Sequence, residues 1–467
     1  MRRALVVGGS VAGLAAALAL SRERYEVRVL DAEPPPPPGP PRQAAPRWAR
    51  PSVPHAFQSH TITSLAVREL RRHVPDLLDS LLSAGAVLFD LTTAMPAGPF
   101  GAQRAPGDED LVALGCRRTV FELILRQYAL SRPNIEVSHA VTVRALRLGP
   151  RREVRAVVAD GAGEVPASLV VDATGRRAAS RAWLRAAGVP LPADEIAPSG
   201  LAGYARHYRL RGGGLPGPLN RGHAAGYVGS HCAAVLHPSD GDAFAVALGV
   251  LPGDWSLRAL RDPESFTSAV RTSALLAPWL ETDVCDAVSP VYAMTAPPNT
   301  LRISILQSGV RGLYPVGDAA CVTNPLFGRG IALALAQAFA LGPLLSGSGE
   351  MEAGPAAADL AQQLLRPWFE HAAEADRERI GRWREAPDVP LPPAPIAAAA
   401  AADRDVWRAL TRMLMTLQTP AEAFGAPGFA QRVRHAAATG LPPGDAPRRP
   451  ELLEAIAAAR RPQEVPA

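Results

Sequence analysis

Residues 5–18, LVVGGSVAGLAAAL, have the types and spacing needed to bind a phosphate group. Gly8, Ser10 and Gly13 occupy the three positions of a G-x-G-x-x-G turn, with serine where the middle glycine belongs. In such a turn the first glycine permits the bend, the second lets the backbone approach a pyrophosphate, and the third lets helix pack on strand. The helix that follows presents free N–H groups and its positive dipole end to the phosphates. Because serine adds only a small hydroxyl, we predict a nucleotide site at Gly8, Gly9, Ser10 and Gly13.

Two competing interpretations explain fewer residues. Ser10 could be the nucleophile of a G-x-S-x-G elbow, but the fifth position is Ala12, and no earlier strand can supply the oxyanion loop. Arg2 and Arg3 before the mostly apolar run 4–20 imitate a twin-arginine secretion signal. The same run is better explained as a strand, a glycine turn and a helix.

The neighbouring residues predict the elements that hold this turn. Residues 4–7 form a short apolar run, residues 14–20 an alanine- and leucine-rich helix, and residues 26–30 an alternating strand that ends at Asp31. Asp31 lies 18 positions after Gly13, where a dinucleotide-binding unit places the acid that binds ribose hydroxyls. A degenerate turn is weak evidence by itself, so more distant segments decide.

Two such segments carry related chemistry. LVVDATGR at 169–176 is an apolar strand that ends in Asp172, and LYPVGDAACVTNPLFGRGI at 313–331 is a strand, a loop and the start of an apolar helix. The second segment contributes the candidate cofactor residues Gly317, Asp318, Pro325, Gly328 and Gly330.

Each residue type in these segments suits a nucleotide with a planar ring. Asp318 can accept hydrogen bonds from ribose or ribityl hydroxyls, and a helix N-cap is the alternative role. Gly328 and Gly330 let the backbone lie flush against a ring, and the dipole of the following helix favours an anion. We interpret Asp172 as structural rather than catalytic.

Together the three segments resemble the flavin monooxygenases of the p-hydroxybenzoate hydroxylase type, over about residues 1–345. The resemblance implies that the first turn holds the pyrophosphate of FAD, that the D-x-A-T-G strand lies near the adenosine, and that Gly317 and Asp318 contact the ribityl chain and pyrophosphate. Arg118 matches the family's arginine that faces the cofactor, and a solvated arginine at a helix start is the alternative. VPHAFQSH at 53–60 and the CRRTVFELIL and TNPLFGRG segments resemble the natural-product branch that includes polyether epoxidases.

The resemblance implies an α/β fold in which a Rossmann-like FAD-binding domain is interleaved with an antiparallel-sheet substrate domain. We expect the FAD-binding domain over 1–185, with substrate-side segments inserted near 50–100, and again over 296–349. The substrate domain is expected over 186–295, and a C-terminal helical extension over 350–467.

The extension carries no recognisable chemistry. Residues 356–384, 405–418 and 450–461 have helical patterns, and 387–395 has the composition of a linker. We expect the extension to pack on the flavin domain or to close a homodimer.

The expected substrate domain alternates over 203–210 and 232–251, with a hairpin turn at 240–242. In the family such a sheet roofs the substrate cavity over the flavin. Tyr204, Arg206 and Tyr208 share one strand face, and this face or the loop with His55 and His60 is expected to line the cavity. The candidate catalytic residues are therefore His55, His60 and Arg206; a face that packs on a helix is the alternative.

Composition excludes several other classes. The chain has 467 residues with 49 basic and 44 acidic side chains, and all basic ones are arginine, which excludes lysine-dependent mechanisms. The spread of this charge argues against nucleic acid. Four widely spaced cysteines and unpaired histidines predict no disulfide framework and no metal site, and they favour the cytoplasm. Residues 331–345 are too short to span a bilayer, so a buried helix is expected.

The expected function is a flavin-dependent monooxygenase. We find no second G-x-G-x-x-G after a strand, which argues against disulfide reductases and Baeyer–Villiger enzymes with two such domains. The missing lysine and W-x-W-x-I-P signature argue against flavin halogenases. The resemblance implies that one atom of dioxygen enters a hydrophobic natural product through a flavin hydroperoxide, by hydroxylation or epoxidation. NAD(P)H or a separate flavin reductase would supply electrons. The alternatives are an FAD-dependent reductase or desaturase and a non-catalytic FAD-binding protein.

Overall fold

A parallel sheet is the centre of the N-terminal half of this computed structural model, which describes residues 2–97, 104–349, 352–385, 387, 394–437 and 446–461. The five strands run in the order β18-β9-β1-β2-β5, and all neighbours are parallel. Their bounds are β1 (Arg2–Val7), β2 (Tyr25–Asp31), β5 (Ile135–His139), β9 (Val170–Asp172) and β18 (Leu313–Pro315). The strand, turn, helix and strand predicted over 4–31 are therefore confirmed.

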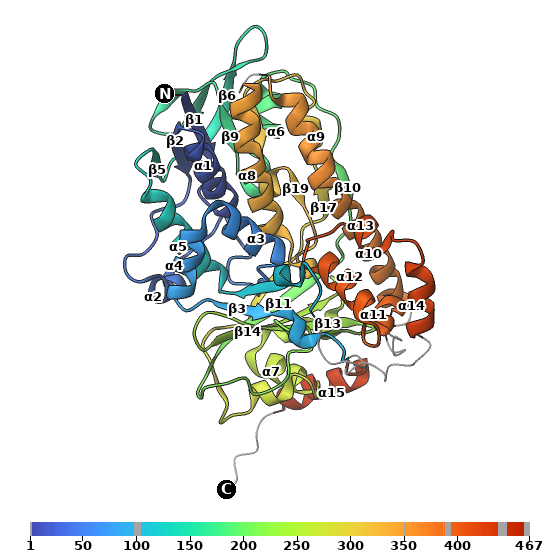
Figure 1. The fold of residues 1–467 in the computed structure, drawn as a ribbon. Coiled ribbons are helices and arrows are strands. Elements are labelled where there is room, and N and C mark those ends of the chain that lie inside the picture. The colour runs from blue at the N-terminus through green and yellow to red at the C-terminus, as the bar shows by residue number, and fades with distance from the viewer. Residues whose placement is uncertain are drawn as a thin grey trace.

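Three helices cover this sheet: α1 (Val11–Arg22), α5 (Arg118–Leu130) and α8 (Gly330–Ser348). α1 packs directly on α8 (Figure 1), and its residues from Gly13 to Leu20 are all buried. Small residues permit this contact, because a Cβ on Gly342 of α8 would lie 3.0 Å from the carbonyl oxygen of Ala19. By length and composition α8 is the one described helix that could cross a membrane, yet 67% of its most apolar window is buried inside the protein.

A six-stranded antiparallel sheet lies below the parallel sheet in Figure 1. Its strands are β11 (Ala202–Leu210), β12 (Ala225–Val228), β13 (Cys232–Pro238), β14 (Ala243–Val250), β15 (Cys285–Ala287) and β16 (Tyr292–Thr295). The predicted hairpin joins β13 to β14, with Gly241 at φ +61°. One face packs on α7 (Pro263–Arg271), and α15 (Arg449–Ala459) packs on α7 in turn.

Smaller elements connect these two layers. Three further sheets contain β3 (Val87–Asp90) with β4 (Val112–Gly115), β6 (Val143–Leu148) with β7 (Val154–Ala159) and β8 (Gly163–Pro166), and β10 (Glu195–Ala197) with β17 (Asn299–Leu301) and β19 (Cys321–Val322). The other helices before residue 350 are α2 (Pro41–Ala44), α3 (Ser64–His73), α4 (Pro75–Ser83) and α6 (Ala179–Ala186).

The C-terminal extension is helical, as predicted, and lies against one side of both layers (Figure 1). Its helices before α15 are α9 (Gly354–Leu364), α10 (Arg366–Glu385), α11 (Pro395–Ala400), α12 (Arg404–Leu414), α13 (Pro420–Phe424) and α14 (Phe429–Ala437). The single helix expected over 356–384 is broken between α9 and α10, where Pro367 has no N–H to continue the first helix. Most of the expected linker 387–395 falls outside the described residues.

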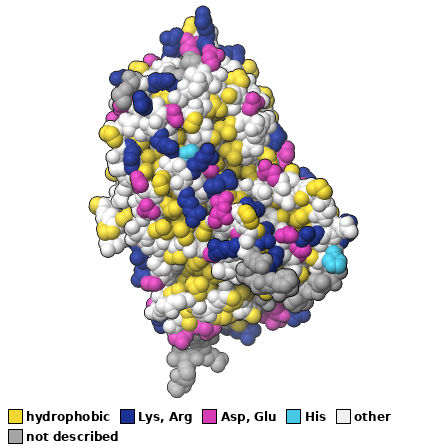
Figure 2. Space-filling model, viewed as in Figure 1, with side chains coloured by type: hydrophobic (Ala, Val, Ile, Leu, Met, Phe, Trp, Pro, Cys, Tyr) yellow, Lys and Arg dark blue, Asp and Glu magenta, His cyan; other side chains and the backbone are white. Residues whose placement is uncertain are grey.

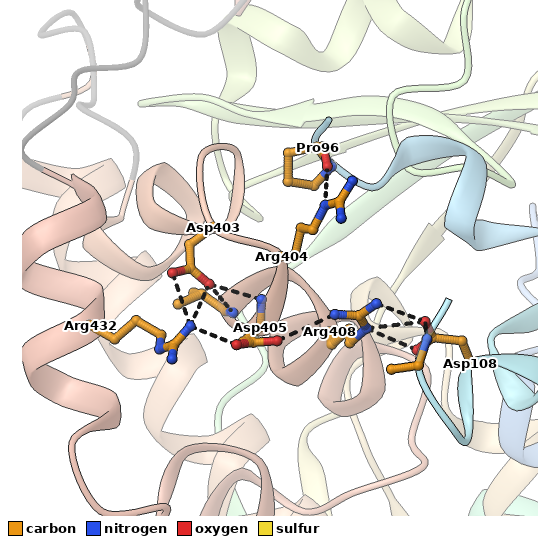
Figure 3. A network of polar contacts seen from close by, with 9 residues as sticks. Pro96, Asp108, Asp403, Arg404, Asp405, Arg408 and Arg432 are labelled. Carbon is orange, nitrogen blue, oxygen red and sulfur yellow. Dashed lines mark hydrogen bonds and ion pairs between the residues drawn. The ribbon is translucent and has the colours of Figure 1, made fainter. Parts of the chain in front are cut away.

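Charged side chains tie α12 to the body of the protein (Figure 3). Arg408 donates to both carboxylate oxygens of Asp108, with Nη2 3.0 Å from Oδ2, and Arg404 donates to the carbonyl of Pro96 at 3.0 Å. Arg432 of α14 pairs with Asp405 at 2.6 Å. The extension thus packs on the rest of its own chain, which was one of the two expected arrangements.

Basic and acidic side chains are intermixed on the face shown in Figure 2.

Candidate functional site

A cavity of about 670 Å³ opens at the carboxyl ends of β1, β2 and β9. Its wall comes from residues within the segments 7–12, 30–32, 50–61, 141–144, 173–179, 293–297 and 318–334, together with Arg118. Eleven predicted site residues line it, namely Gly8, Gly9, Ser10, Asp31, His55, His60, Arg118, Asp318, Pro325, Gly328 and Gly330. Open α/β sheets bind their ligands at this edge.

The glycine turn has the geometry that its sequence predicts. Gly8 has φ +109°, and a Cβ there would lie 2.3 Å from the carbonyl oxygen of Ala173. A Cβ on Gly13 would lie 1.8 Å from the carbonyl oxygen of Gly8, so helix α1 could not pack so closely with any other residue. Gly13 thus acts from behind the cavity wall. Ser10 has φ −95°, which serine adopts without strain.

The side chain of Ser10 has a partner that the local sequence does not reveal. Arg118 Nη2 donates to Ser10 Oγ at 3.3 Å, and Arg118 Nη1 lies 3.3 Å from His60 Nε2. Glu122 lies one turn along α5 from Arg118, at 3.6 Å, and also pairs with buried Arg50. Burial lowers the pKa of Arg118, which Glu122 partly opposes. Arg118 therefore bridges the glycine turn and residues 55–61, which we call the histidine loop, rather than facing solvent.

The acid at the end of β2 is also partnered. Arg126 Nη2 lies 2.7 Å from Asp31 Oδ2 and donates to the carbonyl oxygen of Gly9 as well. Both charged side chains are buried. Asp31 keeps further lone pairs, because an ionised carboxylate accepts about four hydrogen bonds. Sequence analysis missed Arg126, because it is one of several charged residues on α5 and no local motif distinguishes it.

Asp318 presents its carboxylate to the cavity, while Asp172 does not. Burial raises the pKa of Asp318, and the nearby Arg118 opposes that shift. Asp172 is fully buried and accepts hydrogen bonds from the amides of Thr174 and Ser180, each at 2.9 Å. These bonds fix the turn after β9 and the start of α6. Asp172 is therefore absent from the cavity wall, and its expected place among the cofactor-binding residues is corrected to a supporting role.

The loop before α8 needs two of its glycines for different reasons. Gly317 has φ +60°, and a Cβ there would lie 2.6 Å from Ala12 Cβ. Its amide donates to Gln337 at 2.9 Å, so Gly317 supports the cavity from behind rather than lining it. Gly328 has φ +65° and faces Thr61. A Cβ at Gly328 would lie 3.0 Å from the Cβ of Thr61.

His55 and His60 lie together, with ring centroids 5.8 Å apart. His60 Nδ1 lies 2.8 Å from the carbonyl oxygen of Gln58 and must donate to it, so Nε2 is the acceptor that faces Arg118. Burial lowers the pKa of His60 to about 3, with Arg118 adding to the shift. Burial also lowers the pKa of His55 well below 6.5. Both imidazoles are therefore neutral near pH 7.

The histidine loop is hydrogen-bonded to the antiparallel sheet. His237 of β13 contacts two hydroxyls, Ser59 Oγ at 2.7 Å and Thr61 Oγ1 at 2.8 Å. His207 of β11 donates from Nε2 to the carbonyl oxygen of Phe57 at 2.8 Å. These two histidines gave no signal in sequence, because their strands show only ordinary alternation.

Arg206 lies away from the cavity, which corrects its expected catalytic role. Its guanidinium donates to the carbonyl of Pro263 at 3.0 Å and to Thr267 Oγ1 at 2.9 Å, both on α7. Tyr204 and Tyr208 point to the same side and belong to the core between sheet and helix. The alternative interpretation of this face, a sheet packed on a helix, is the correct one.

No model of a known protein family matches the chain. Protein Rv3254 of Mycobacterium tuberculosis is 26% identical over 411 residues, which cover 81% of this chain and 82% of that protein.

Several solved structures share the fold over most of the chain. The chain is similar to pqsL, a probable FAD-dependent monooxygenase from Pseudomonas aeruginosa, with TM-score 0.57 and 16% identity over 82% of this chain and 98% of that one. It is similar to p-nitrophenol 4-monooxygenase PnpA from Pseudomonas putida DLL-E4, with TM-score 0.57 and 16% identity over 89% of this chain and 99% of that one. The chain is also similar to the flavin-dependent brominase Bmp2, with TM-score 0.58 and 13% identity over 94% of this chain and 99% of that one. The chain has the fold of the FAD-dependent monooxygenases of the p-hydroxybenzoate hydroxylase type, as its three motifs predicted.

Proposed function

We propose that this protein binds FAD non-covalently in the cavity and is a monooxygenase. The observation that carries the proposal is the wall itself, where the glycine turn, the N-termini of α1 and α8, and the carboxylates of Asp31 and Asp318 all meet. The glycine turn fits a pyrophosphate because no side chain has room at Gly8 or Gly9. A Cβ at Gly8 would overlap the backbone of Ala173, and a Cβ at Gly9 would lie 2.5 Å from Asp31 Oδ2. Such a bare backbone surface beside a helix N-terminus suits a pyrophosphate.

Each part of the wall has a role toward this cofactor. The amides of Gly9 and Ser10 and the guanidinium of Arg118 would bind the pyrophosphate, and Asp31 and Asp318 would accept from sugar and ribityl hydroxyls. Pro325, Gly328 and Gly330 would face the ring system, since all three line the cavity and a Cβ at Gly330 would meet only open space. The positive end of α8 lies beside them. Bound flavin would supply the oxygen-activating chemistry, which the side chains of this protein lack.

The residues of the histidine loop face the space left for a substrate. His60 has both ring nitrogens engaged, whereas His55 has no side-chain hydrogen-bond partner among the described residues. A neutral imidazole without a partner can accept a proton from a phenol, so His55 is the stronger candidate base for hydroxylation. Epoxidation of an alkene would need no base. We keep both outcomes for a hydrophobic natural-product substrate, and we drop Arg206.

The names of two similar structures support oxygen transfer over the alternatives. PnpA is named a 4-monooxygenase and pqsL a probable FAD-dependent monooxygenase, while Bmp2 is named a brominase on the same fold. Because fold does not fix function, a reductase or desaturase and a non-catalytic FAD-binding protein stay as alternatives. A lysine-dependent halogenation is excluded by the absence of lysine from the sequence.

The test has two stages. Purified protein reconstituted with FAD should show a flavin spectrum, and failure to retain flavin would reject the proposal at its first step. The loaded protein should then consume NAD(P)H, directly or through an added flavin reductase, and should place label from ¹⁸O₂ into a product. Turnover of substrate without label would favour the reductase or desaturase.

We also place the protein in the cytoplasm. All four cysteines are free and buried, which suits a reducing compartment. The extension packs on its own chain, so it is not needed to close a homodimer. A homodimer therefore stays a prediction. Size-exclusion chromatography with light scattering tests this directly.

A further inference from the structure

One helix of the C-terminal extension, α10, contacts both ends of the segment 324–329, which we call the cavity loop. At its start, Asn324 Nδ2 donates to Asp376 Oδ1 at 2.8 Å. At its end, the Arg329 guanidinium lies between the rings of Phe327 and Trp368, 4.7 and 4.5 Å from their centroids. Pro325 and Gly328, which line the cavity, lie between these two attachments.

The attachment at Asn324 sets the backbone of the loop. Asn324 Oδ1 accepts a hydrogen bond from the backbone N–H of Leu326 at 2.9 Å. The backbone N–H of Asn324 donates to Asn299 Oδ1 at 2.6 Å. Asn299 Nδ2 in turn donates to Asp376 Oδ2 at 2.8 Å. Asp376 is fully buried, so its carboxylate orients both amide side chains away from water. With its oxygen committed to Leu326, Asn324 has one orientation that satisfies all its polar atoms.

The attachment at Arg329 uses a cation without a carboxylate. Arg329 is 1% exposed, and among the described residues no carboxylate forms an ion pair with it. Instead Nη1 donates to His371 Nδ1 at 3.1 Å and Nη2 to Met413 Sδ at 3.4 Å. Two aromatic faces replace water around the charge. The end of the loop is thereby held against α10 and α12.

The same helix continues to the antiparallel sheet. Arg379 Nη1 donates to the carbonyl of Gly200, just before β11, at 3.1 Å, and Arg379 Nη2 lies 2.9 Å from Asp376 Oδ1. Trp383 Nε1 donates to the carbonyl of Gly229, before β13, at 2.8 Å. Trp368, Ala372, Asp376, Arg379 and Trp383 are all buried and follow one another at helical spacing, so they form one face of α10.

We infer that this face of α10 positions the cavity loop relative to the antiparallel sheet, with Asp376 as the central positioning residue. The inference rests on the proposed binding of FAD, because the loop is part of the wall assigned to the flavin. Removing the carboxylate leaves the donors of Asn299, Asn324 and Arg379 buried without their shared acceptor, which is costly in the interior. The loop then leaves its binding conformation, while the glycine turn at Gly8 is untouched.

The first experiment measures the FAD dissociation constant by flavin fluorescence during reconstitution. Asp376→Ala should raise it by about tenfold or more, and Asp376→Asn, which keeps the size and one acceptor, by less. Glu378→Ala is the matched control, since Glu378 lies on the exposed side of the same helix and forms a 3.6 Å ion pair with exposed Arg382. It should change affinity by less than about twofold.

A second control separates positioning from general loss of stability. Arg449→Ala breaks the 3.1 Å ion pair between α15 and Asp254, and neither residue lines the cavity. It should lower the melting temperature of the FAD-free protein and leave FAD affinity within about twofold of wild type. If Asp376→Ala lowers the melting temperature without changing FAD affinity, as Arg449→Ala should, the inference is wrong.

A double-mutant cycle tests the route through the loop. If Asp376 acts through Asn324, adding Asp376→Ala to Asn324→Ala should weaken binding by less than about threefold more, and fully additive effects would overturn the inference. Should Asp376→Ala fail to fold, Asp376→Asn enters the cycle in its place. Wild type that binds no FAD rejects the proposed function, whereas wild type and Asp376→Ala that bind FAD equally reject only the role of α10.

Discussion

Arg118 Nη2 donates to Ser10 Oγ across 3.3 Å, and this contact joins the helix start after β4 to the glycine turn after β1. The hydroxyl that departs from the glycine pattern is therefore bonded to the arginine that matches the family pattern. Ser10 also keeps φ −95°, so it adds a contact without backbone strain. The serine is an accommodated variation of the turn, not a sign of its decay.

Ser10→Gly should therefore retain FAD. The variant loses one long hydrogen bond to a charged donor, which corresponds to a loss of binding of about tenfold or less. Titration of FAD into the flavin-free variant measures this loss. Failure of Ser10→Gly to bind would mean that the hydroxyl itself is an essential ligand.

Gly13→Val should abolish FAD binding, because a Cβ at this position would lie 1.8 Å from the carbonyl oxygen of Gly8.

Asp318→Ala should weaken FAD binding more than Ser10→Gly does, since it removes a carboxylate from the cavity wall. Absorbance of the purified variants after dialysis against FAD reports retention. Circular dichroism should show that Asp318→Ala keeps its secondary structure; retention of FAD by Gly13→Val would contradict the turn assignment.

Arg126→Met should destabilise the flavin-free protein by about 3–5 kcal/mol, because it leaves the Asp31 carboxylate buried without its partner. The double variant Arg126→Met with Asp31→Asn removes the unpaired charge and should recover part of that loss. Equilibrium unfolding in urea measures both. A single variant less than about 1 kcal/mol below wild type would show that Asp31 is hydrated when Arg126 is absent.

His55→Ala and His60→Ala should differ if a phenol is the substrate. His55 has the free ring nitrogen, so its loss should slow the chemical step by about a hundredfold. His60→Ala should affect FAD affinity through Arg118 more than it affects the rate. Single-turnover oxygen transfer and its pH profile make the measurement. Wild-type rates in both variants would instead favour epoxidation without a base.

Acid should destabilise the fold between about pH 6.5 and pH 4. Burial lowers the pKa of His223 to about 4, and of His371 to about 4, in each case from 6.5. As pH falls through this window, the unfolded chain binds protons that the folded chain does not, so the free energy of unfolding decreases. His223 alone contributes about 3 kcal/mol across the window.

The control for this effect is His223→Gln, which removes one titrating group. The free energy of unfolding of this variant should fall less steeply with acid than that of wild type, by about one proton per molecule near pH 5. Urea unfolding at a series of pH values gives both slopes. Identical slopes would show that His223 titrates normally in the folded protein.

Local sequence predicted the elements whose constraints are local. The turn at Gly8, the hairpin at Gly241 and the apolar strand that ends at Asp172 each depend on backbone rules that a few neighbouring residues satisfy. The cavity wall followed from these elements, because parallel strands deliver their carboxyl ends to one edge.

The errors and omissions have a non-local cause. Alternation placed Arg206 on one face of β11, but only the packing of α7 against that face decides that it is the side away from the cavity. Arg126, His237 and Asp376 were missed because the partners that connect them to the cavity wall are distant in sequence. Asp31, Thr61 and Asn324 lie 95, 176 and 52 positions away from them, respectively. Spacing within one element cannot reveal such pairs.

The position of α10 late in the chain has a consequence for synthesis on the ribosome. The glycine turn, Asp31 and Asp318 are all translated before residue 320, and the cavity loop follows directly. Trp368, Asp376 and Trp383 leave the ribosome only after those parts, so a nascent chain that already has its parallel sheet still lacks the support of its cavity loop. Since chains fold from the N-terminus as they emerge, nascent protein should capture FAD firmly only once nearly the whole chain has been made, and premature termination within the extension should yield a folded but flavin-poor product.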